Sequence, residues 1–581
     1  MISRLSESKF VNAYNILCAE MTGTNSREAI YPTFCRIPEN GKSLKHTHFE
    51  AEIFYIVNGV GEMNIQNEKC LVKSGDLIRI PPFADHELVN SSSEDLVFLS
   101  VYSEDFEIPK IPQNVLITAA PPTPNGPLHL GHISGPYLAS DLISRYFSLR
   151  GSKTERHCGT DDHQNYVNEA ARLADSNTEN FRKHMRSRIL NGLAKFNIAF
   201  DEFLEPKRDS EYQKSVLQFY YQAVEAGIIQ TSEKQYPYCD HCDEFLFDAL
   251  LEGICPHCKE ESHGACEHCG FVASPYVLEG AKCARCKVQA QYKQTPVSTF
   301  DLSKFFPLIK DDLEILNLAP RIKKLCQMLE KHGAVDIALS TPSGPGIPIP
   351  NSEQHLHVWF EMAAHYKNFA LSDKHWVHCF GFDNSFYYLL FIPTLLRAMY
   401  AHAKLPDSVV TNEFLSLEGF KFSTSRKHAI WADEFDANAE FLRLYLTLHR
   451  PAYTEVDFSR KTFEEFSKGL SKQMERLHSL ALEREYTVES HGVQKSLVSC
   501  NRITRDVESA FAEFDLRRAS RCVLDFMDRT LNGAERGLAQ KLMLRTLATL
   551  MAPFMPKESE KLLCALGVEK AVWVKDWVRV L

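Results

Sequence analysis

The chain has 581 residues, about four times the ~150 residues of a typical domain, so we expect several domains. Its composition, with 44% hydrophobic and 24% charged residues, is typical of a globular protein and argues against long disordered tails. No run approaches the ~18 apolar residues of a membrane span, and residues 1–10 are too polar for a signal peptide, so we expect a cytoplasmic protein without a membrane partner. The net charge of −10 gives no support to nucleic-acid binding through phosphate contacts.

The first 110 residues predict a small all-β domain. Short runs such as 52–57 and 96–102 are rich in apolar, β-branched and aromatic residues, and turn-prone pairs such as Asn58-Gly59 separate them. We therefore expect several short strands and no helix of note over residues 1–110.

A metal site is predicted within this β domain. His46, His48 and Glu52 have the same parity, so in one strand they project from one face, and His86 can arrive from another strand. Three imidazole nitrogens and one carboxylate suit Zn²⁺, Fe²⁺, Mn²⁺ or Ni²⁺, with positions left for water or substrate. The segment 41–90 resembles the paired cupin motifs. That resemblance implies a cupin barrel with these four ligands and does not identify the metal.

The next segment predicts a nucleotide site. A strand over 114–119 runs through a Pro-rich loop into His129-Leu130-Gly131-His132, and a helix-like segment comes next at 136–149. In such an arrangement a helix N-terminus and backbone amides face phosphate, while imidazoles donate to transition-state oxygens. The four-residue motif is weak alone and needs the support of motifs downstream in the chain.

Four further motifs strengthen the interpretation. They are Gly159-Thr160-Asp161-Asp162-His163, Val358-Trp359-Phe360-Glu361, Gly381-Phe382-Asp383 and Lys421-Phe422-Ser423-Thr424-Ser425. Their order and spacing resemble methionyl-tRNA synthetase across roughly residues 113–460. The resemblance implies a class I, Rossmann-like α/β catalytic domain over 111–433, with ATP at the carboxyl ends of parallel strands.

The same resemblance implies roles for individual residues. The residues that act on the phosphates during catalysis would be His129, His132, Lys421 and Ser423. ATP, with Mg²⁺, would be bound by Asn125, Gly131, Gly381 and Asp383, the last at the ribose. The amino acid would be bound by Thr123, Asp161, Trp359, Tyr366 and Tyr388, with Asp161 at the α-ammonium.

Four C-x-x-C pairs within 48 residues predict structural zinc in an insertion at about 235–292. The inner pairs, Cys255/Cys258 and Cys266/Cys269, match the single-zinc pattern of many synthetases of this family. The outer pairs, Cys239/Cys242 and Cys283/Cys286, are then expected to share a second Zn²⁺. Four thiolates leave no open position, so both sites would be structural; redox use of the pairs is a minor alternative.

The chain departs from the methionyl pattern around the amino acid. Thr123 replaces an aromatic hydroxyl, Tyr388 replaces a His, and Met362 and Ala363 replace Ala and Pro. We therefore expect methionine not to be the preferred substrate, although drift without a change of specificity is the alternative. Thr424 replaces the second Lys of the phosphate loop, which weakens the expected stabilisation of pyrophosphate.

Residues 434–581 predict a helical bundle that resembles the anticodon-binding domain. Apolar residues recur at helical spacing at Phe466, Leu470, Met474, Leu477 and Ala481. The stretch that reads the anticodon is not recognisable, and a basic cluster at 517–521 is interpreted as a solvated helix face. We expect no tRNA partner.

The whole arrangement resembles the two-domain hydrazine synthetases of bacterial natural-product biosynthesis. That resemblance implies activation of an amino acid as its adenylate and transfer to the hydroxyl of an N-hydroxylated amine, N6-hydroxylysine. The cupin metal, expected to be Zn²⁺, would then promote N–N bond formation within the ester. Two alternatives stay open: a methionyl-tRNA synthetase paralogue with a regulatory cupin, and a cupin oxygenase of an amino acid. The sequence leaves the amino acid and the oligomeric state open.

Overall fold

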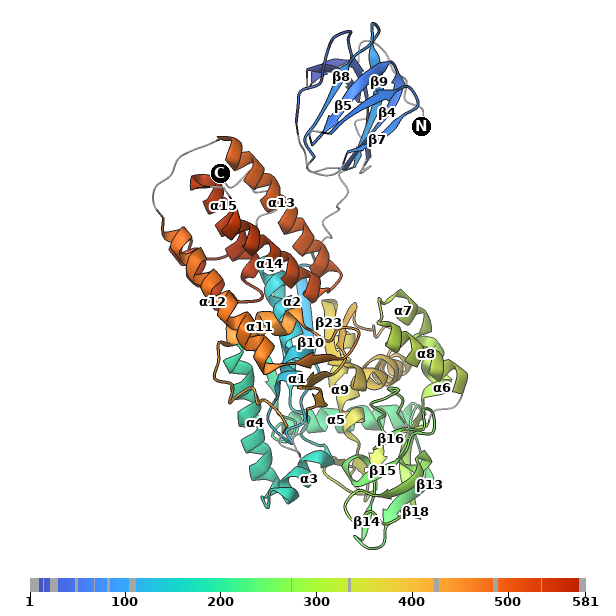
Figure 1. Cartoon of the computed structure of the whole chain (residues 1–581). Helices are drawn as coiled ribbons and strands as arrows, with labels where there is room; N and C mark the ends of the chain where they lie inside the picture. The colour runs from blue at the N-terminus through green and yellow to red at the C-terminus, as the bar shows by residue number, and fades with distance from the viewer. Residues whose placement is uncertain are drawn as a thin grey trace.

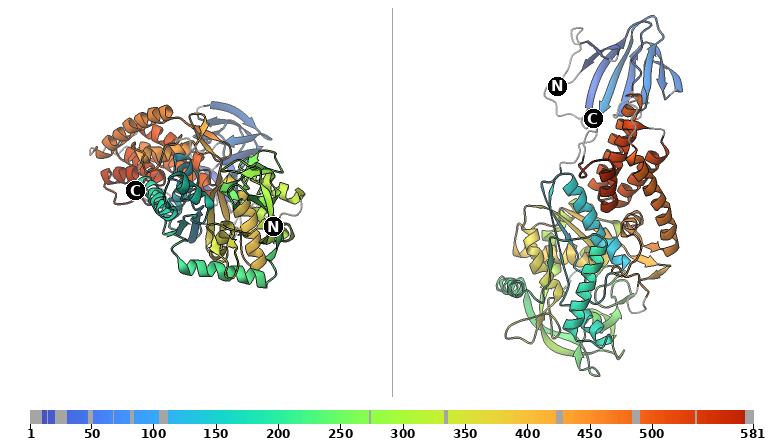
Figure 2. Two further views of the ribbon diagram at one scale, coloured as in Figure 1. Left: turned by 90° about the horizontal axis from the view of Figure 1, so that it is seen from below. Right: turned by 90° about the vertical axis from the view of Figure 1, so that its left-hand side faces the viewer.

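A computed structural model describes most of the chain (Figure 1). The described residues are 10–13, 15–20, 30–46, 51–66, 68–80, 84–103, 111–272, 274–332, 336–422, 428–483, 490–533 and 536–573. His48, Ser423 and Thr424 of the predicted sites lie outside them. Figures 1 and 2 show a β-barrel, an α/β core and a helical bundle in chain order.

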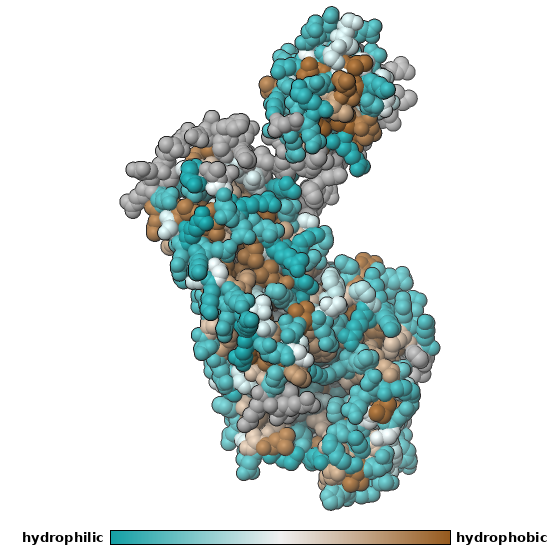
Figure 3. Space-filling view, viewed as in Figure 1, coloured by the Kyte–Doolittle hydropathy of each residue, from teal (hydrophilic) through white to brown (hydrophobic). Residues whose placement is uncertain are grey.

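The N-terminal body is a barrel of two antiparallel sheets, ordered β1-β2-β3-β9-β4-β7 and β6-β5-β8. The strands are β1 (Val11–Ala13), β2 (Ile16–Glu20), β3 (Ile30–Ile37), β4 (Ala51–Asn58), β5 (Val60–Ile65), β6 (Glu68–Lys73), β7 (Leu77–Ile80), β8 (His86–Asn90) and β9 (Leu96–Ser103). Alternation along β4 buries Phe54 and Ile56 and exposes Tyr55. Figure 3 shows apolar side chains among polar ones on the surface of the barrel. The predicted all-β domain is confirmed.

The catalytic core is built on a parallel sheet, ordered β12-β11-β10-β23-β24. Its strands are β10 (Asn114–Ala119), β11 (Lys153–Gly159), β12 (Glu202–Leu204), β23 (His375–Gly381) and β24 (Ser408–Asn412). The helices around it are α2 (Leu138–Leu149), α3 (Asn165–Leu173), α4 (Thr178–Lys195), α5 (Ser210–Glu225), α9 (Val358–Ala370) and α10 (Ile392–Met399). Central β10 is buried from Val115 to Ala119, because helices cover both faces of the sheet. The predicted Rossmann-like core is confirmed.

A largely β insertion comes after α5. The antiparallel pair β13 (Gln230–Cys239) and β18 (Gln291–Asp301) forms its stem, and between them lie β14 (Glu244–Phe245), β15 (Leu251–Ile254), β16 (Glu261–Ser262) and β17 (Glu279–Cys283). The connection back to the core holds α6 (Leu302–Phe305), α7 (Lys310–Ile315), α8 (Pro320–His332), β19 (Asp336–Ala338), β20 (Ser340–Thr341), β21 (Ile347–Pro348) and β22 (His355–Leu356). The stem therefore extends beyond the predicted 235–292 at both ends.

The C-terminal body is helical. It contains α11 (Ala439–Leu448), α12 (Arg460–Leu482), α13 (Ser490–Ala512), α14 (Leu516–Asn532), α15 (Gly537–Met551) and α16 (Pro556–Ala565). The predicted apolar stripe lies on α12, where Leu470, Met474, Leu477 and Ala481 are buried. A small sheet joins β25 (Leu415–Leu417), β26 (Phe420–Lys421) and β27 (Val456–Phe458), so the chain returns to the core beyond residue 433. Within the described ranges, no helix combines the length and apolarity that crossing a membrane requires.

Candidate active site

The two histidines after β10 form one stacked unit. The short helix α1 (Leu130–His132) places the ring of His132 3.7 Å, centroid to centroid, from that of His129. The ring of Phe422 stacks on His129 at 4.6 Å. A Cβ at Gly131 would lie 2.9 Å from ring atoms of His129, so a larger residue there would displace the His129 ring.

The histidine unit is suited to donate hydrogen bonds. The backbone N–H of His129 donates to Nδ1 of His132 at 3.2 Å, which leaves the proton of a neutral His132 on Nε2. Burial, and then the neighbouring His132, lower the pKa of His129 well below its ordinary value. His129 is therefore neutral near pH 7. Its Nδ1 has no hydrogen-bond partner among the described residues.

Asp161 is a buried carboxylate with one open oxygen. It comes after β11, and its Oδ2 accepts a hydrogen bond from the Thr123 hydroxyl at 3.3 Å. Its Oδ1 is buried and has no partner in the described part of the chain. Burial first, and Glu361 second, raise the pKa of Asp161 well above its ordinary value. Such a group is stabilised by an incoming cation, as an α-ammonium would be.

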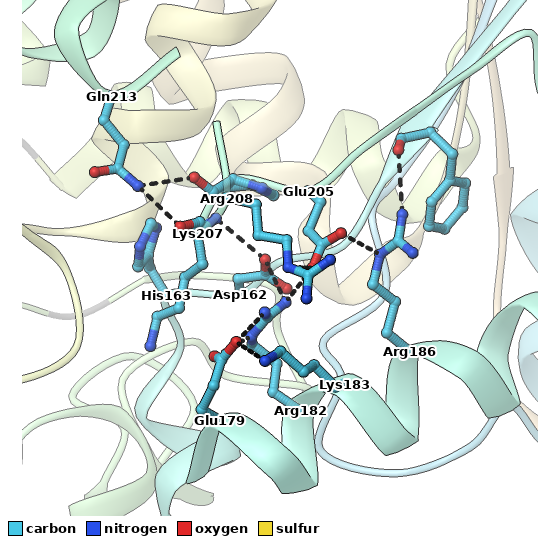
Figure 4. A network of polar contacts seen from close by, with 12 residues as sticks. Asp162, His163, Glu179, Arg182, Lys183, Arg186, Glu205, Lys207, Arg208 and Gln213 are labelled. Atoms are coloured by element: carbon cyan, nitrogen blue, oxygen red, sulfur yellow. Dashed lines mark hydrogen bonds and ion pairs between the residues drawn. The ribbon is translucent and has the colours of Figure 1, made fainter. Parts of the chain in front are cut away.

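The neighbouring Asp162 is, by contrast, compensated by an ionic network (Figure 4). The fully buried Arg182 of α4 donates from Nη1 to Asp162 at 3.0 Å and to Glu205 at 3.1 Å. Its remaining N–H groups bind Glu179. The network fixes the loop after β11, and Asp161 forms no ion pair with the residues that the structure describes. Sequence reasoning did not identify Arg182.

A second buried pair lies beside Asp161. Nδ1 of His163 lies 2.7 Å from Oε2 of Glu361, and both side chains are buried. Both residues belong to the motifs that the sequence showed, so their presence in the site could have been predicted, although their pairing could not.

The predicted amino-acid pocket is aromatic. Tyr388, in the segment Phe386–Phe391, lies 5.3 Å from Tyr366 and 5.4 Å from Trp359, measured between ring centroids. It also lies 4.5 Å from His378, which the sequence did not indicate. Trp359 stacks on Tyr387 at 3.7 Å. Burial first, then Tyr366 and, more weakly, Asp161 raise the pKa of Tyr388, so Tyr388 lies within electrostatic range of Asp161.

The predicted ATP residues lie at the carboxyl ends of β10 and β23. Asn125 is exposed in the loop after β10. A Cβ at Gly381 would lie 2.5 Å from Oδ1 of Asp383. Burial first, and then Glu267, raise the pKa of Asp383 to about 6. Lys421 of β26 forms an ion pair with Glu267.

The eight cysteines form two clusters with the predicted grouping. In one, Sγ of Cys239 lies 3.4 Å from that of Cys286, and Sγ of Cys242 lies 3.8 Å from that of Cys283. In the other, the Cys255–Cys269 and Cys258–Cys266 distances are 3.8 and 3.5 Å. A tetrahedral Zn–S distance of ~2.3 Å places the sulfurs ~3.8 Å apart, so both clusters could hold zinc.

Three of the four predicted cupin ligands are described, and His46 and Glu52 each lie beside His86. His46 forms an isolated β-bridge with His86, and their ring centroids are 4.3 Å apart. Oε2 of Glu52 lies 3.4 Å from Nε2 of His86, and Ser100 donates to the other oxygen. Two imidazoles and a carboxylate are ligand types that a divalent ion accepts, although among the described residues only the two cysteine clusters bring their ligand atoms close enough together for a metal ion. His46 takes part in an isolated β-bridge, and β4 begins only at Ala51. His48 lies outside the described residues. A single strand that carries residues 46, 48 and 52 therefore stays a prediction.

Comparison with known proteins identifies both parts of the chain. The family described as tRNA synthetases class I (M) matches residues 115–474, which is more than half of the chain. The chain belongs to this class I synthetase family. The cupin domain family matches residues 33–102.

The relatives of the synthetase part are methionine–tRNA ligases. The Pyrococcus furiosus enzyme is 27% identical over 531 residues, covering 80% of this chain and 72% of that protein. The Methanobrevibacter smithii enzyme is 32% identical over 372 residues, covering 60% of this chain and 56% of that protein. Mycobacterium tuberculosis methionyl-tRNA synthetase in complex with methionyl-adenylate shares the fold, with a TM-score of 0.62, 16% identity and coverage of 78% of this chain and 93% of that chain. Membership supports an ATP-dependent ligase that forms an aminoacyl-adenylate.

Two of the residues that depart from the methionyl pattern, Thr123 and Tyr388, interact with Asp161. Thr123 is its hydrogen-bond donor. Met362 and Ala363 are buried on α9, and Tyr388 is enclosed by aromatic rings. Oδ1 of Asp161 has no hydrogen-bond partner among the described residues.

Proposed function

We propose that this synthetase is an ATP-dependent hydrazine synthetase. It activates an amino acid as aminoacyl-AMP, transfers the acyl group to the hydroxyl of an N-hydroxylated amine, and forms an N–N bond within the ester. The observation that carries the first step is the buried Asp161 with its open Oδ1: it follows β11, the parallel neighbour of β10, and the histidine unit follows β10.

In the proposed adenylation, different residues bind the amino acid, the ribose and the phosphates. Asp161 binds the α-ammonium, and Asp383 accepts from the ribose of MgATP. His129 and His132 donate N–H groups to the phosphate oxygens as negative charge develops there. Lys421 and Ser423 complete the phosphate site. Because both imidazoles act as neutral donors, they bind phosphate without having to be protonated.

Transfer to a hydroxylamine makes the second bond possible without an oxidant. The hydroxyl oxygen attacks the acyl carbon and AMP leaves, which gives an O-acyl hydroxylamine. The α-amine of the acyl group then attacks the hydroxylamine nitrogen, the N–O bond breaks, and the carboxylate leaves with the electron pair. One proton is lost from the attacking nitrogen. The hydroxylamine nitrogen is reduced and the amine nitrogen is oxidised in the same step, so no external oxidant is needed.

The barrel is the proposed place of this second step. His46, Glu52 and His86, together with His48, would hold the ion, and we propose Zn²⁺. Bound there, a divalent ion would supply Lewis-acid chemistry to the ester. The presence of a cupin domain in a synthetase chain is what supports a two-stage reaction.

Aminoacylation of tRNA is the second candidate, because the matching proteins are methionine–tRNA ligases and the P. furiosus match covers 80% of this chain. The buried Met362 and the enclosed Tyr388 favour the hydrazine proposal, since they change the pocket that methionine would occupy. Both candidate functions begin with formation of the same kind of intermediate, an aminoacyl-adenylate.

The test is a panel of amino acids incubated with the full chain, ATP and N6-hydroxylysine, read by mass spectrometry. A parallel panel replaces hydroxylysine with tRNA. We expect AMP and a product whose mass equals amino acid plus hydroxylysine minus water, with an N–N bond that isotope-labelled nitrogens identify. Charging of tRNA with methionine, without any hydroxylysine product, would overturn the proposal.

A further inference from the structure

Arg321 connects four parts of the molecule near the ATP site. It lies at the start of α8, and its Nη2 donates to the carbonyls of Glu267 and His268, at 3.2 and 2.5 Å. Its Nη1 donates to the buried carboxylate of Glu413, directly after β24. Its guanidinium carbon lies 3.6 Å from the ring centroid of Phe382. One cation therefore ties the loop Cys266–Cys269 to the turn that carries Asp383.

Packing between the inner cysteine cluster and this turn reinforces the connection. A Cβ at Gly270 would lie 2.9 Å from the Phe382 ring, so the loop approaches the ring as closely as glycine allows. Phe271 is buried and its ring centroid lies 5.5 Å from that of Phe386. The inner cysteine cluster is thus held against the residues on both sides of Asp383.

Glu267 carries this connection to the phosphate strand. Its backbone is fixed by Arg321, and its carboxylate forms the ion pair with Nζ of Lys421. Both side chains of the pair are more than half exposed. An exposed pair of this kind contributes little to stability and exchanges readily for a better partner. A triphosphate, with more charge than one carboxylate, is such a partner for a lysine.

We propose that Glu267 is a counter-ion that Lys421 exchanges for ATP: it holds the Lys421 ammonium beside the inner cysteine cluster until the triphosphate displaces it, and Arg321 fixes Glu267 relative to the Gly381–Asp383 turn. The inference rests on the proposed adenylation, in which Lys421 binds phosphate. It gives the cysteine-rich insertion a role in nucleotide binding in addition to its structural one.

The first test measures binding, so that it does not depend on turnover. Isothermal titration of the full chain with Mg²⁺ and α,β-methylene-ATP compares the parent with Glu267→Gln and with Glu261→Gln, an exposed carboxylate of the same insertion. We expect Glu267→Gln to bind about two- to fivefold tighter, because the phosphates no longer compete for Lys421, and Glu261→Gln to match the parent. The difference should shrink in ~1 M salt, where screening acts over ~3 Å.

A double-mutant cycle with Lys421→Met separates this role from a structural one. In the Lys421→Met background, Glu267→Gln should have no further effect on the dissociation constant, because the competing ammonium is gone. Unchanged or weaker binding by Glu267→Gln, or the same effect in both backgrounds, would overturn the inference. Pyrophosphate exchange is measured alongside. A binding shift without exchange supports this inference and contradicts the proposed adenylation.

The Arg321 part has its own test. Arg321→Met should loosen the Gly381–Asp383 turn, which Arg321 contacts through Phe382, so the dissociation constant for the analogue should rise about tenfold with zinc content retained. Arg321→Lys keeps the charge but not the fork of donors, so its dissociation constant should lie between those of the parent and Arg321→Met. Lys324→Met, an exposed cation on the same helix, is the control. Parent-like binding by both Arg321 variants would show that Arg321 does not position the site. If Arg321→Met fails to fold, the dissociation constant of Arg321→Lys alone tests whether Arg321 positions the site.

Discussion

The guanidinium of Arg443 and the carboxylate of Asp141 lie 2.7 Å apart with no solvent exposure, and they join the helical bundle to the parallel sheet. Arg443 also donates to the carbonyls of Phe196, Pro553 and Phe554, at 2.8 to 3.0 Å. Asp141 lies on α2, which comes after the histidine unit in the chain. The bundle therefore holds α2, the helix that follows the histidine unit in the chain.

Replacement of Arg443 should show the strength of this connection. Arg443→Met leaves the buried Asp141 without its closest buried partner, which costs ~3 kcal/mol in the free energy of unfolding, although Arg145 and Arg156 still contact the carboxylate. Chemical denaturation measures the change. Lys214→Met, which removes a pair with both side chains more than two-thirds exposed, should cost less than ~1 kcal/mol. Equal effects would contradict the interpretation.

Asp161→Asn should impair activation of the amino acid. The variant keeps the shape of the side chain but removes the charge that the α-ammonium needs, and loss of one charge-assisted hydrogen bond costs ~1.5 to 3 kcal/mol. We expect kcat/KM for the amino acid in pyrophosphate exchange, without tRNA, to fall roughly tenfold or more. Asp175→Asn, at an exposed position, is the control. Unchanged exchange in Asp161→Asn would show that the ammonium binds elsewhere.

The elements that the sequence predicted well are those whose pattern is local. The strand over 114–119 is a continuous apolar run because both faces of a parallel sheet are buried, and the stripe on α12 has the helical period. The four C-x-x-C pairs likewise close within short loops.

The relationships that the sequence could not show are tertiary. Glu267 and Lys421 are 154 positions apart, and nothing in either segment indicates their ion pair. Arg182 reaches Asp162 only because α4 packs beside the end of β11. The same holds for β27, which pairs with β25 beyond the predicted end of the catalytic domain.

Activity should depend on the ionisation of Asp383. Its raised pKa, about 6, means that the carboxylate is protonated at a higher pH than an ordinary aspartate and then accepts fewer hydrogen bonds from a ribose. We expect kcat/KM for ATP to fall as the pH drops through about 6. Glu267 contributes to the raised pKa, so Glu267→Gln should move this acid limb to lower pH. If the acid limb of the pH profile does not shift in Glu267→Gln, the limb does not report the ionisation of Asp383.

The inner cysteine cluster should be needed for zinc and for folding of the insertion. Cys266→Ser removes one of four thiolates, and metal binding is coupled to the folding of such small lobes. Elemental analysis should show one zinc fewer per chain, with lower solubility. Cys70→Ser, at an exposed position in the barrel, should keep the full content. A soluble Cys266→Ser protein with full zinc and full activity would disprove the assignment.

The two proposed sites can be separated with variants in different domains. His86→Ala removes a buried imidazole from the barrel site, so the ion should bind weakly or not at all. The histidine unit lies in another domain and should be unaffected. This variant should still consume ATP and accumulate the hydroxylamine O-ester without converting it to the hydrazine, and His129→Ala should block formation of the ester itself.

Mixing the two variants provides the decisive measurement. Since each keeps the site that the other lacks, the mixture should restore some hydrazine, to the extent that the ester survives diffusion between molecules. Chemically prepared ester, supplied to the His129→Ala protein, removes that dependence and should be converted at close to the parent rate. If His86→Ala forms hydrazine from ATP and hydroxylysine as fast as the parent, N–N bond formation does not occur in the barrel, and the cupin has a regulatory or oxidative role instead.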